Sequence, residues 1–140
     1  MAQTTSDAEQ VVRDYTEMWS EKDYSRISRV VSDSFVHRTP GAPDGEVRGR
    51  DGLEAFMREI ETAFPDFEVS IIDMLATDET VMTENEFTMT HEGEFNGIPP
   101  TGREVEFRSM ATCRVADGEL TELREYLDMQ GILERLGAVD

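Results

Sequence analysis

The sequence predicts an α+β domain in which helices cover one face of a curved antiparallel sheet. Apolar residues recur at helical spacing in the first half of the chain, whereas the second half alternates between apolar and polar residues in long runs. The alternating runs follow one another directly and are separated by short turns, which favours antiparallel strands over a parallel sheet. A chain of 140 residues can bury one hydrophobic core, so we expect a single domain over residues 1–140.

The first half of the chain is expected to form three helices and one short strand. The first helix follows the capping-box pattern Ser6–Glu9 and carries Trp19 on its inner face. The third helix has the clearest apolar stripe and ends at Pro65, which cannot continue a helix. Residues 39–50 contain two prolines and three glycines and are expected to be a loop. The expected elements are a helix over about residues 7–20, a short helix after Asp23, a strand at Phe35–Arg38 and a helix from Asp51.

The second half is expected to form four long strands and a terminal helix. Asp117-Gly118 is a typical hairpin turn between the last two strands. Residues 93–102 (GEFNGIPPTG) are a loop. After Asp128 the alternation gives way to a helical pattern with Ile132, Leu133 and Leu136 on one face. The expected strands are Phe67–Leu75, Val81–His91, Arg103–Val115 and Glu119–Asp128.

The strongest compositional feature is an excess of acid. The chain has 31 acidic and 13 basic residues, a net charge of −18, and Lys22 is the only lysine. Such a charge destabilises a compact state by self-repulsion, which molar salt screens to a Debye length of about 3 Å. The composition therefore favours a salt-rich cytoplasm, as in a halophile, with an ordinary acidic protein as the alternative. Nucleic acids and anionic membranes are poor partners because both attract basic surfaces.

The sequence offers no local metal motif, transmembrane segment or disulfide. Its polar N-terminus does not resemble a signal peptide, so we expect a cytoplasmic protein. Cys113 is the only cysteine and falls within a strand, where a small core residue is expected. The two histidines, His37 and His91, and Asp128 do not lie at metal-ligand spacing, so a metal is not expected.

The last strand places polar and apolar residues on both of its faces. One face carries Leu120, Glu122, Arg124, Tyr126 and Asp128, and the other carries Thr121, Leu123, Glu125 and Leu127. The first set fits neither an ordinary core nor an ordinary surface, and a polar-lined cavity beneath the helices would accommodate it. Alternation alone does not decide which face points inward.

Four stretches carry a resemblance to a known family. They are residues 63–67 (AFPDF), 90–102 (THEGEFNGIPPTG), 114–120 (RVADGEL) and 128–137 (DMQGILERLG). With them the chain resembles the SnoaL-like polyketide cyclases (ester cyclases) of the nuclear transport factor 2-like superfamily over nearly its whole length. The resemblance implies an α+β cone, with a curved antiparallel sheet wrapped around three N-terminal helices, a short C-terminal helix and a pocket inside the cone.

The resemblance also implies a function and a site. Its characterised members close a ring by intramolecular aldol condensation without a cofactor, and it gives the general acid/base role to Asp128, on the inner face of the last strand. Burial would raise the pKa of such a carboxylate and make it a better base. The ligand is expected to be a small hydrophobic or polar-aromatic carbonyl compound. The residues expected to contact it are Trp19, His37, Asn85, His91, Arg124 and Tyr126.

Several of these assignments have alternatives. His91 could instead organise the loop at residues 93–102, and His37 and Asn85 could be structural. Arg124 stands where the family often has an aromatic residue, and it could bind an acidic substrate or pair with Glu122. The whole protein could be a non-catalytic ligand binder, an isomerase or an epoxide hydrolase on the same fold. The resemblance further implies a homodimer formed through the outer sheet face, for which Leu123 and Leu127, on the face opposite Asp128, are suitable.

Overall fold

The computed structural model describes residues 3–137; residues 1–2 and 138–140, which the single-domain prediction includes, lie outside the described part. The helices are α1 (Thr5–Glu21), the 3₁₀ turn η1 (Tyr24–Arg26), α2 (Ile27–Val30), α3 (Gly49–Ala63) and α4 (Met129–Arg135). The strands are β1 (Val31–Arg38), β2 (Glu46–Arg48), β3 (Glu68–Ala76), β4 (Thr80–Thr90), β5 (Glu104–Ala116) and β6 (Glu119–Leu127). No helix in residues 3–137 combines the length and apolar character needed to cross a membrane.

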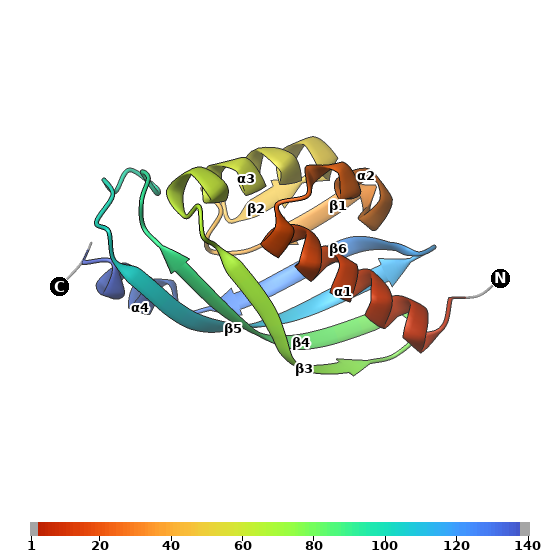
Figure 1. Cartoon of the computed structure of the whole chain (residues 1–140). Coiled ribbons are helices and arrows are strands. Elements are labelled where there is room, and N and C mark those ends of the chain that lie inside the picture. The colour runs from red at the N-terminus through yellow and green to blue at the C-terminus, as the bar shows by residue number, and fades with distance from the viewer. Residues whose placement is uncertain (1–2, 138–140) are drawn as a thin grey trace.

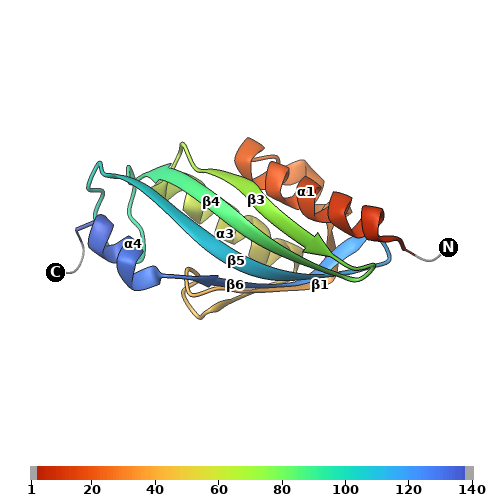
Figure 2. The ribbon, with the colours of Figure 1, turned by 90° about the horizontal axis from the view of Figure 1, so that it is seen from below.

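All six strands form one curved sheet in the order β2-β1-β6-β5-β4-β3. Helices α1, α2 and α3 lie on its concave face, and α4 lies at the end of the sheet near the C-terminus (Figure 1). The opposite, convex face of β3–β6 is seen from below without a covering helix (Figure 2). This arrangement confirms the expected α+β cone.

The sheet is mixed rather than purely antiparallel. Strand β1 pairs with β6 in parallel, with His37 opposite Leu123, whereas the other pairs are antiparallel. Strand β1 begins at Val31, four residues earlier than the expected start at Phe35. The sequence did not indicate this, because Val31 continues the apolar stripe of the preceding helix as well as it begins a strand. Strand β2 lies inside the segment expected to be a loop. His37 therefore lies between Val47 of β2 and Leu123 of β6 in the sheet, with its side chain buried.

The beginning of α1 differs from the expected one. Thr4 is the N-cap: its hydroxyl accepts from the Asp7 backbone N–H at 3.1 Å, and the Asp7 carboxylate accepts from the Thr4 N–H at 3.0 Å. This is a capping box, but it starts at Thr4 rather than Ser6. Trp19 faces inward as expected and contacts Phe56 and Phe67.

A β-bulge near the start of β6 decides which of its faces points inward. Val115 pairs with Leu120, but the preceding Arg114 pairs with Glu122, so one extra residue interrupts the ladder. An extra residue reverses the phase of alternation for the rest of a strand. Leu120 therefore points into the core, while beyond the bulge the inward residues are Leu123, Glu125 and Leu127, which line the cavity described below.

Candidate functional site

A cavity of about 110 Å³ lies between the concave face of the sheet and helices α1 and α3. Met129 and Ile132 bring α4 into its wall. Eight aromatic side chains line the cavity: Tyr15, Trp19, Phe56, Phe64, Phe67, Phe87, Phe95 and Phe107. The polar side chains in the wall are Tyr15, Thr16, His37, Thr39, Thr83, Asn85 and Glu125. The cavity is thus an apolar space with a small number of polar groups, as is typical of a small-molecule site.

Glu125 is the carboxylate of this cavity. Its Oε1 accepts a hydrogen bond from the Thr39 hydroxyl at 3.0 Å, and its Oε2 accepts one from the Ser109 hydroxyl at 3.1 Å. The Thr39 hydroxyl in turn accepts from the Gly41 backbone N–H at 3.2 Å. Groups from β5 and from the loop after β1 therefore hold both carboxylate oxygens in place.

The pKa of Glu125 lies below its ordinary value of 4.5. Burial alone would raise the pKa of this carboxyl, but the nearby His37 imidazole and the hydroxyls of Thr39 and Ser109 stabilise the charged form more strongly. Glu125 is therefore ionised at neutral pH. The direction is opposite to the raised pKa expected for a catalytic carboxylate in this fold.

His37 lies beside Glu125 in the cavity wall. Its Nε2 lies 3.6 Å from Glu125 Oε1, with 6% of the His37 side chain and 13% of the Glu125 side chain exposed. This separation is close enough for charge attraction but longer than a hydrogen bond. Neither ring nitrogen of His37 has a hydrogen-bond partner among residues 3–137. A buried imidazole with two unpaired nitrogens beside a cavity is a group that a ligand can satisfy.

Tyr15 contributes a second unpaired group. Its side chain is 5% exposed, and its hydroxyl has no hydrogen-bond partner within the described part of the chain. Burial raises the pKa of Tyr15 above its ordinary value of 10, so the phenol stays protonated. Tyr15 thus offers a neutral O–H donor to the cavity.

Asn85 lies in the cavity wall, as expected, and continues the hydrogen-bond network behind Glu125. Its Nδ2 donates to the hydroxyls of Thr83 at 3.1 Å and Ser109 at 3.3 Å. Since the Ser109 hydroxyl donates to Glu125, Asn85 supports the orientation of the carboxylate through Ser109.

Asp128, the residue expected to be the base, lies outside the cavity. It is exposed and is the N-cap of α4, where its Oδ1 accepts from the Gly131 backbone N–H at 2.9 Å. Because of the bulge, Arg124 and Tyr126 also point away from the cavity: Tyr126 is 62% exposed, and Arg124 Nε lies 3.3 Å from Glu122. The expectation that Arg124, Tyr126 and Asp128 share the inner face is wrong. Of the two roles considered for Arg124, binding an acidic substrate or pairing with Glu122, the structure forms the pair with Glu122.

His91 also lies outside the cavity wall. It is fully buried; its Nδ1 accepts from the Thr101 backbone N–H at 3.3 Å, and its backbone pairs with Gly102 and Arg103. Its ring lies 5.4 Å from that of Phe64, measured between centroids. His91 thus fixes the loop at residues 93–102, which is the alternative considered for it.

Of the residues expected to contact ligand, Trp19, His37 and Asn85 do line the cavity. Glu125 and Tyr15 were not expected to act there. A signal for Glu125 is present in the sequence, because a single carboxylate stands between Leu123 and Leu127 on one strand face. Within residues 3–137 there is no cluster of three side chains that could hold a metal ion.

The sequence matches the family of SnoaL-like polyketide cyclases over residues 9–136, and the chain belongs to this family. No curated protein matches the sequence. IdmH of Streptomyces antibioticus, assigned as a polyketide cyclase, is 27% identical, with 92% of this chain and 97% of IdmH covered and a TM-score of 0.79.

Two further solved structures share the fold at lower identity. A protein of Jannaschia sp. CCS1, assigned as a SnoaL-like polyketide cyclase, is 20% identical with a TM-score of 0.86, covering 97% of this chain and 95% of that one. An M. tuberculosis epoxide hydrolase of the LEH-like type is 22% identical with a TM-score of 0.74, covering 94% of this chain and 90% of that one. The fold therefore occurs with more than one assigned chemistry.

Proposed function

We propose that the protein binds a small carbonyl compound in the cavity and moves a proton at the carbon beside its carbonyl group, with Glu125 as the acid–base group. The proposal rests on one observation: an ionised carboxylate, held by two hydroxyls, faces a buried imidazole without hydrogen-bond partners inside an apolar cavity. Family membership and the similarity to IdmH support a cyclisation as the overall reaction, and we propose that it is an intramolecular aldol reaction.

The proposed reaction keeps all atoms within the substrate. A Glu125 oxygen takes a proton from the carbon, the C–H electron pair forms the enolate double bond, and the carbonyl electron pair moves to oxygen. The enolate carbon then attacks a second carbonyl of the same molecule, forming a C–C bond and an alkoxide. The protonated Glu125 returns its proton to the alkoxide. No electrons leave the substrate, so this chemistry needs no redox cofactor.

A lowered pKa makes Glu125 a weak base, so most of the rate must come from stabilising the enolate oxygen. His37 is suited to this task because its unpaired ring lies beside the carboxylate. A hydrogen bond from His37 to the enolate oxygen would form in an apolar cavity, where hydrogen bonds to a developing charge are strongest.

Glu125→Gln is expected to lower proton transfer by at least about 100-fold, the smaller end of the usual contribution of a general base. The reaction is followed as deuterium incorporation from D₂O into the CH₂ group of phenylacetone by NMR, with the uncatalysed rate subtracted. In the unaltered protein the rate is expected to stay level from neutral pH down to the ordinary carboxyl pKa. It then falls once Glu125 becomes protonated, because its pKa is lowered rather than raised.

Asp128→Asn is the matched control, because asparagine caps a helix about as well as aspartate and leaves α4 intact. Its exchange rate is expected to stay within about twofold of the unaltered protein, since Asp128 lies outside the cavity. If Asp128→Asn stopped exchange and Glu125→Gln did not, the carboxylate at the start of α4 would be the base and this proposal would be wrong.

The epoxide-hydrolase alternative is less well supported. It requires a second carboxylate and an arginine near the first carboxylate. Among residues 3–137 the cavity wall has Glu125 as its carboxylate and contains no arginine. If the unaltered protein binds phenylacetone but shows no deuterium exchange above the uncatalysed rate, we would conclude that it is a non-catalytic binder.

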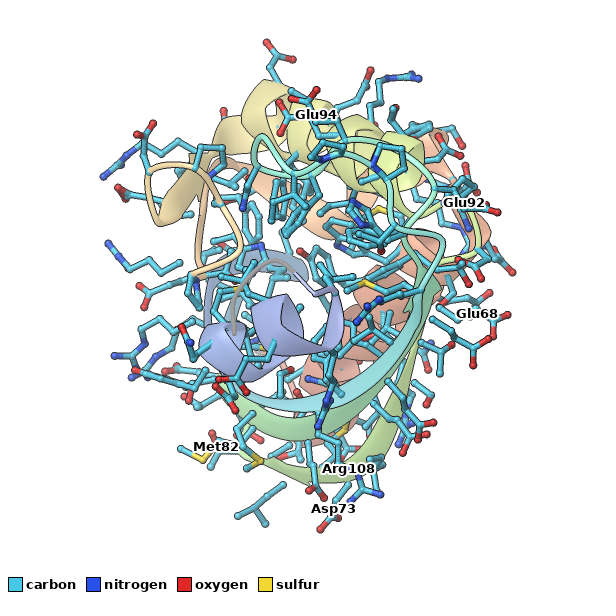
Figure 3. All side chains as sticks on the ribbon, turned by 90° about the vertical axis from the view of Figure 1, so that its left-hand side faces the viewer. Glu68, Asp73, Met82, Glu92, Glu94 and Arg108 are labelled. Carbon is cyan, nitrogen blue, oxygen red and sulfur yellow. The ribbon has the colours of Figure 1, made fainter. Side chains whose placement is uncertain are left out.

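The homodimer is also a proposal, with a corrected interface. Leu123 and Leu127 line the cavity and are not available to a partner. The convex face instead exposes Met82, Met110 and Tyr126, which are 48%, 53% and 62% exposed. Met110 pairs with Tyr126 on the neighbouring strand, and Met82 and Arg108 project from this face away from the helices (Figure 3).

This apolar centre is flanked by both signs of charge, with Arg108 within 3.4 Å of Glu86. A surface with an apolar centre and both charges around it can match a second copy of itself across a two-fold axis. Met110→Glu is expected to shift the protein from dimer to monomer at about 50 μM in sedimentation velocity, because it buries an unpaired charge against a like charge. Ala55→Glu, at an exposed position of α3 on the other side of the sheet, is the control and should leave the dimer intact. A monomeric unaltered protein would contradict the proposal.

The net charge of −18 further favours a salt-rich cytoplasm as the place where the protein works. Carboxylates on the surface repel one another less when salt screens them. All assays of this protein are therefore best done in about 1 M KCl, where the Debye length is about 3 Å.

A further inference from the structure

We propose that the cavity selects uncharged ligands about one aromatic ring wide, that Tyr15 donates a hydrogen bond to the ligand's carbonyl oxygen, and that Glu125 excludes carboxylates. The proposal deepens the proposed function, on which it rests for the carbonyl group of the ligand. It concerns recognition, however, and would hold for a binder without turnover.

The size of the cavity sets the first limit. Its volume of about 110 Å³ is of the same order as a cavity of ~150 Å³ that binds benzene in an engineered protein. An outer groove of about 460 Å³ adjoins it, and Gly41, Phe56, Ile60 and Phe95 line both. A single ring therefore fits inside, with any further part of the ligand directed into the outer groove. A rigid system of four fused rings does not fit this cavity.

The charges around the cavity set the second limit. Glu125 is ionised, and the cavity wall contains no lysine or arginine among residues 3–137. If His37 is protonated, it balances Glu125 alone; if it is neutral, the site is negative. In both states a ligand carboxylate would be buried without a compensating charge, which costs far more than burying a neutral group.

The unpaired hydroxyl of Tyr15 sets the third limit on the ligand, which is a need for a hydrogen-bond acceptor. A buried O–H without a partner costs free energy that a ligand acceptor can recover. Tyr15 lies on α1, one helical turn before Trp19, and both residues line the cavity. The pKa of Tyr15 is raised mainly by burial, and the nearby Glu125 carboxylate raises it further. A carbonyl oxygen near Tyr15 would therefore keep the neighbouring carbon near Glu125.

Trp19 supplies a direct measurement, because it is the only tryptophan and lines the cavity. Its fluorescence is titrated with phenylacetone, with phenylacetate, which has a carboxylate in place of the ketone, and with propylbenzene, which has no oxygen. Titrations in about 1 M KCl screen the net charge of the whole protein and leave the local effect of Glu125. Phenylacetone is expected to bind at least tenfold more tightly than phenylacetate.

Two variants separate the parts of the proposal. Glu125→Gln is expected to strengthen phenylacetate binding by at least tenfold while phenylacetone binding changes little. Tyr15→Phe is expected to weaken phenylacetone binding about tenfold, the usual value of one hydrogen bond to a buried group, and to leave propylbenzene binding unchanged. Circular dichroism and propylbenzene binding report whether each variant keeps its cavity.

Equal binding of phenylacetone and phenylacetate by the unaltered protein would overturn the charge selection. An equal loss of phenylacetone and propylbenzene binding in Tyr15→Phe would overturn the role of its hydroxyl. Selective binding without deuterium exchange would contradict the proposed proton transfer and leave ligand selection standing, so the two proposals fail in different measurements.

Discussion

Gly93→Ala is expected to destabilise the fold by about 3 kcal/mol, the upper part of the range for overpacking a close contact. A Cβ at this position would lie 2.2 Å from the Thr62 carbonyl oxygen and 2.9 Å from its carbon. Both atoms belong to the backbone at the end of α3, so neither can move away as a side chain would. The clash must therefore shift the loop after β4 or the end of the helix.

The surrounding hydrogen bonds make such a shift costly. The backbone N–H groups of Glu92 and Gly93 both donate to the Ala63 carbonyl oxygen, at 2.9 and 3.1 Å. A displaced loop would lose these bonds and would also disturb Phe64 and Phe95, whose rings pack with centroids 5.1 Å apart in the cavity wall. We therefore expect Gly93→Ala to weaken phenylacetone binding as well as stability.

Gly52→Ala is the matched control for the Gly93 variant. Gly52 lies inside α3, where a Cβ would meet only the Val47 side chain at an ordinary 3.6 Å. Replacing a helical glycine by alanine is expected to stabilise the protein by up to about 1 kcal/mol. Urea unfolding in about 1 M KCl measures both variants, since urea leaves the ionic strength unchanged. A loss below about 1 kcal/mol in Gly93→Ala would contradict the argument from the backbone contact.

The sequence was sufficient to predict the layers of the fold but not the inner face of its last strand. Helical periodicity located α1 and α3 because each has one wide apolar stripe. Alternation located β4 correctly, and in the structure its Asn85, Phe87 and Met89 are buried. In β6 the same rule failed because the bulge at the Leu120–Glu122 step adds one residue, which moves Glu125 to the inner face and Arg124 and Tyr126 to the outer face.

A bulge is difficult to detect in one sequence because it depends on the partner strand as well. The segment Leu120–Leu127 alternates equally well in either phase, since it has leucines at both odd and even positions. The parallel pairing of β1 with β6 was missed for a related reason: it joins segments that are far apart in the sequence and carry no local signal. His37 and Glu125 therefore meet through long-range pairing, with His37 directly opposite Leu123 in the register.

The free energy of unfolding is expected to rise by about 3 kcal/mol or more between about 10 mM and 1 M KCl, as the Debye length falls from about 30 Å to about 3 Å. The net charge of −18 is the reason. Two like charges ~10 Å apart in water repel by ~0.4 kcal/mol, and a compact chain of this charge contains many such pairs. Unfolding moves the charges apart, so low salt favours the unfolded state.

Attractive pairs offset only part of this repulsion. Arg26 contacts three acids, Glu17, Glu21 and Asp23, at 3.1–3.2 Å, and most other paired arginines contact a single acid. Such exposed pairs contribute little and are themselves screened by salt. If they dominated, added KCl would weaken the fold, so the sign of the salt effect distinguishes net repulsion from local attraction.

A charge variant tests whether repulsion is the cause. Glu68, Glu92 and Glu94 are exposed and form no ion pair within the part of the chain that the structure describes (Figure 3). Replacing all three by glutamine is expected to stabilise the protein in about 10 mM KCl and to have little effect in about 1 M KCl, where each charge is already screened. Urea unfolding of the unaltered protein and of the triple variant, each in about 10 mM and about 1 M KCl, gives the free energies of unfolding to be compared. Equal stability of the unaltered protein at both concentrations would exclude adaptation to salt, and an equal effect of the variant at both would exclude repulsion as its cause.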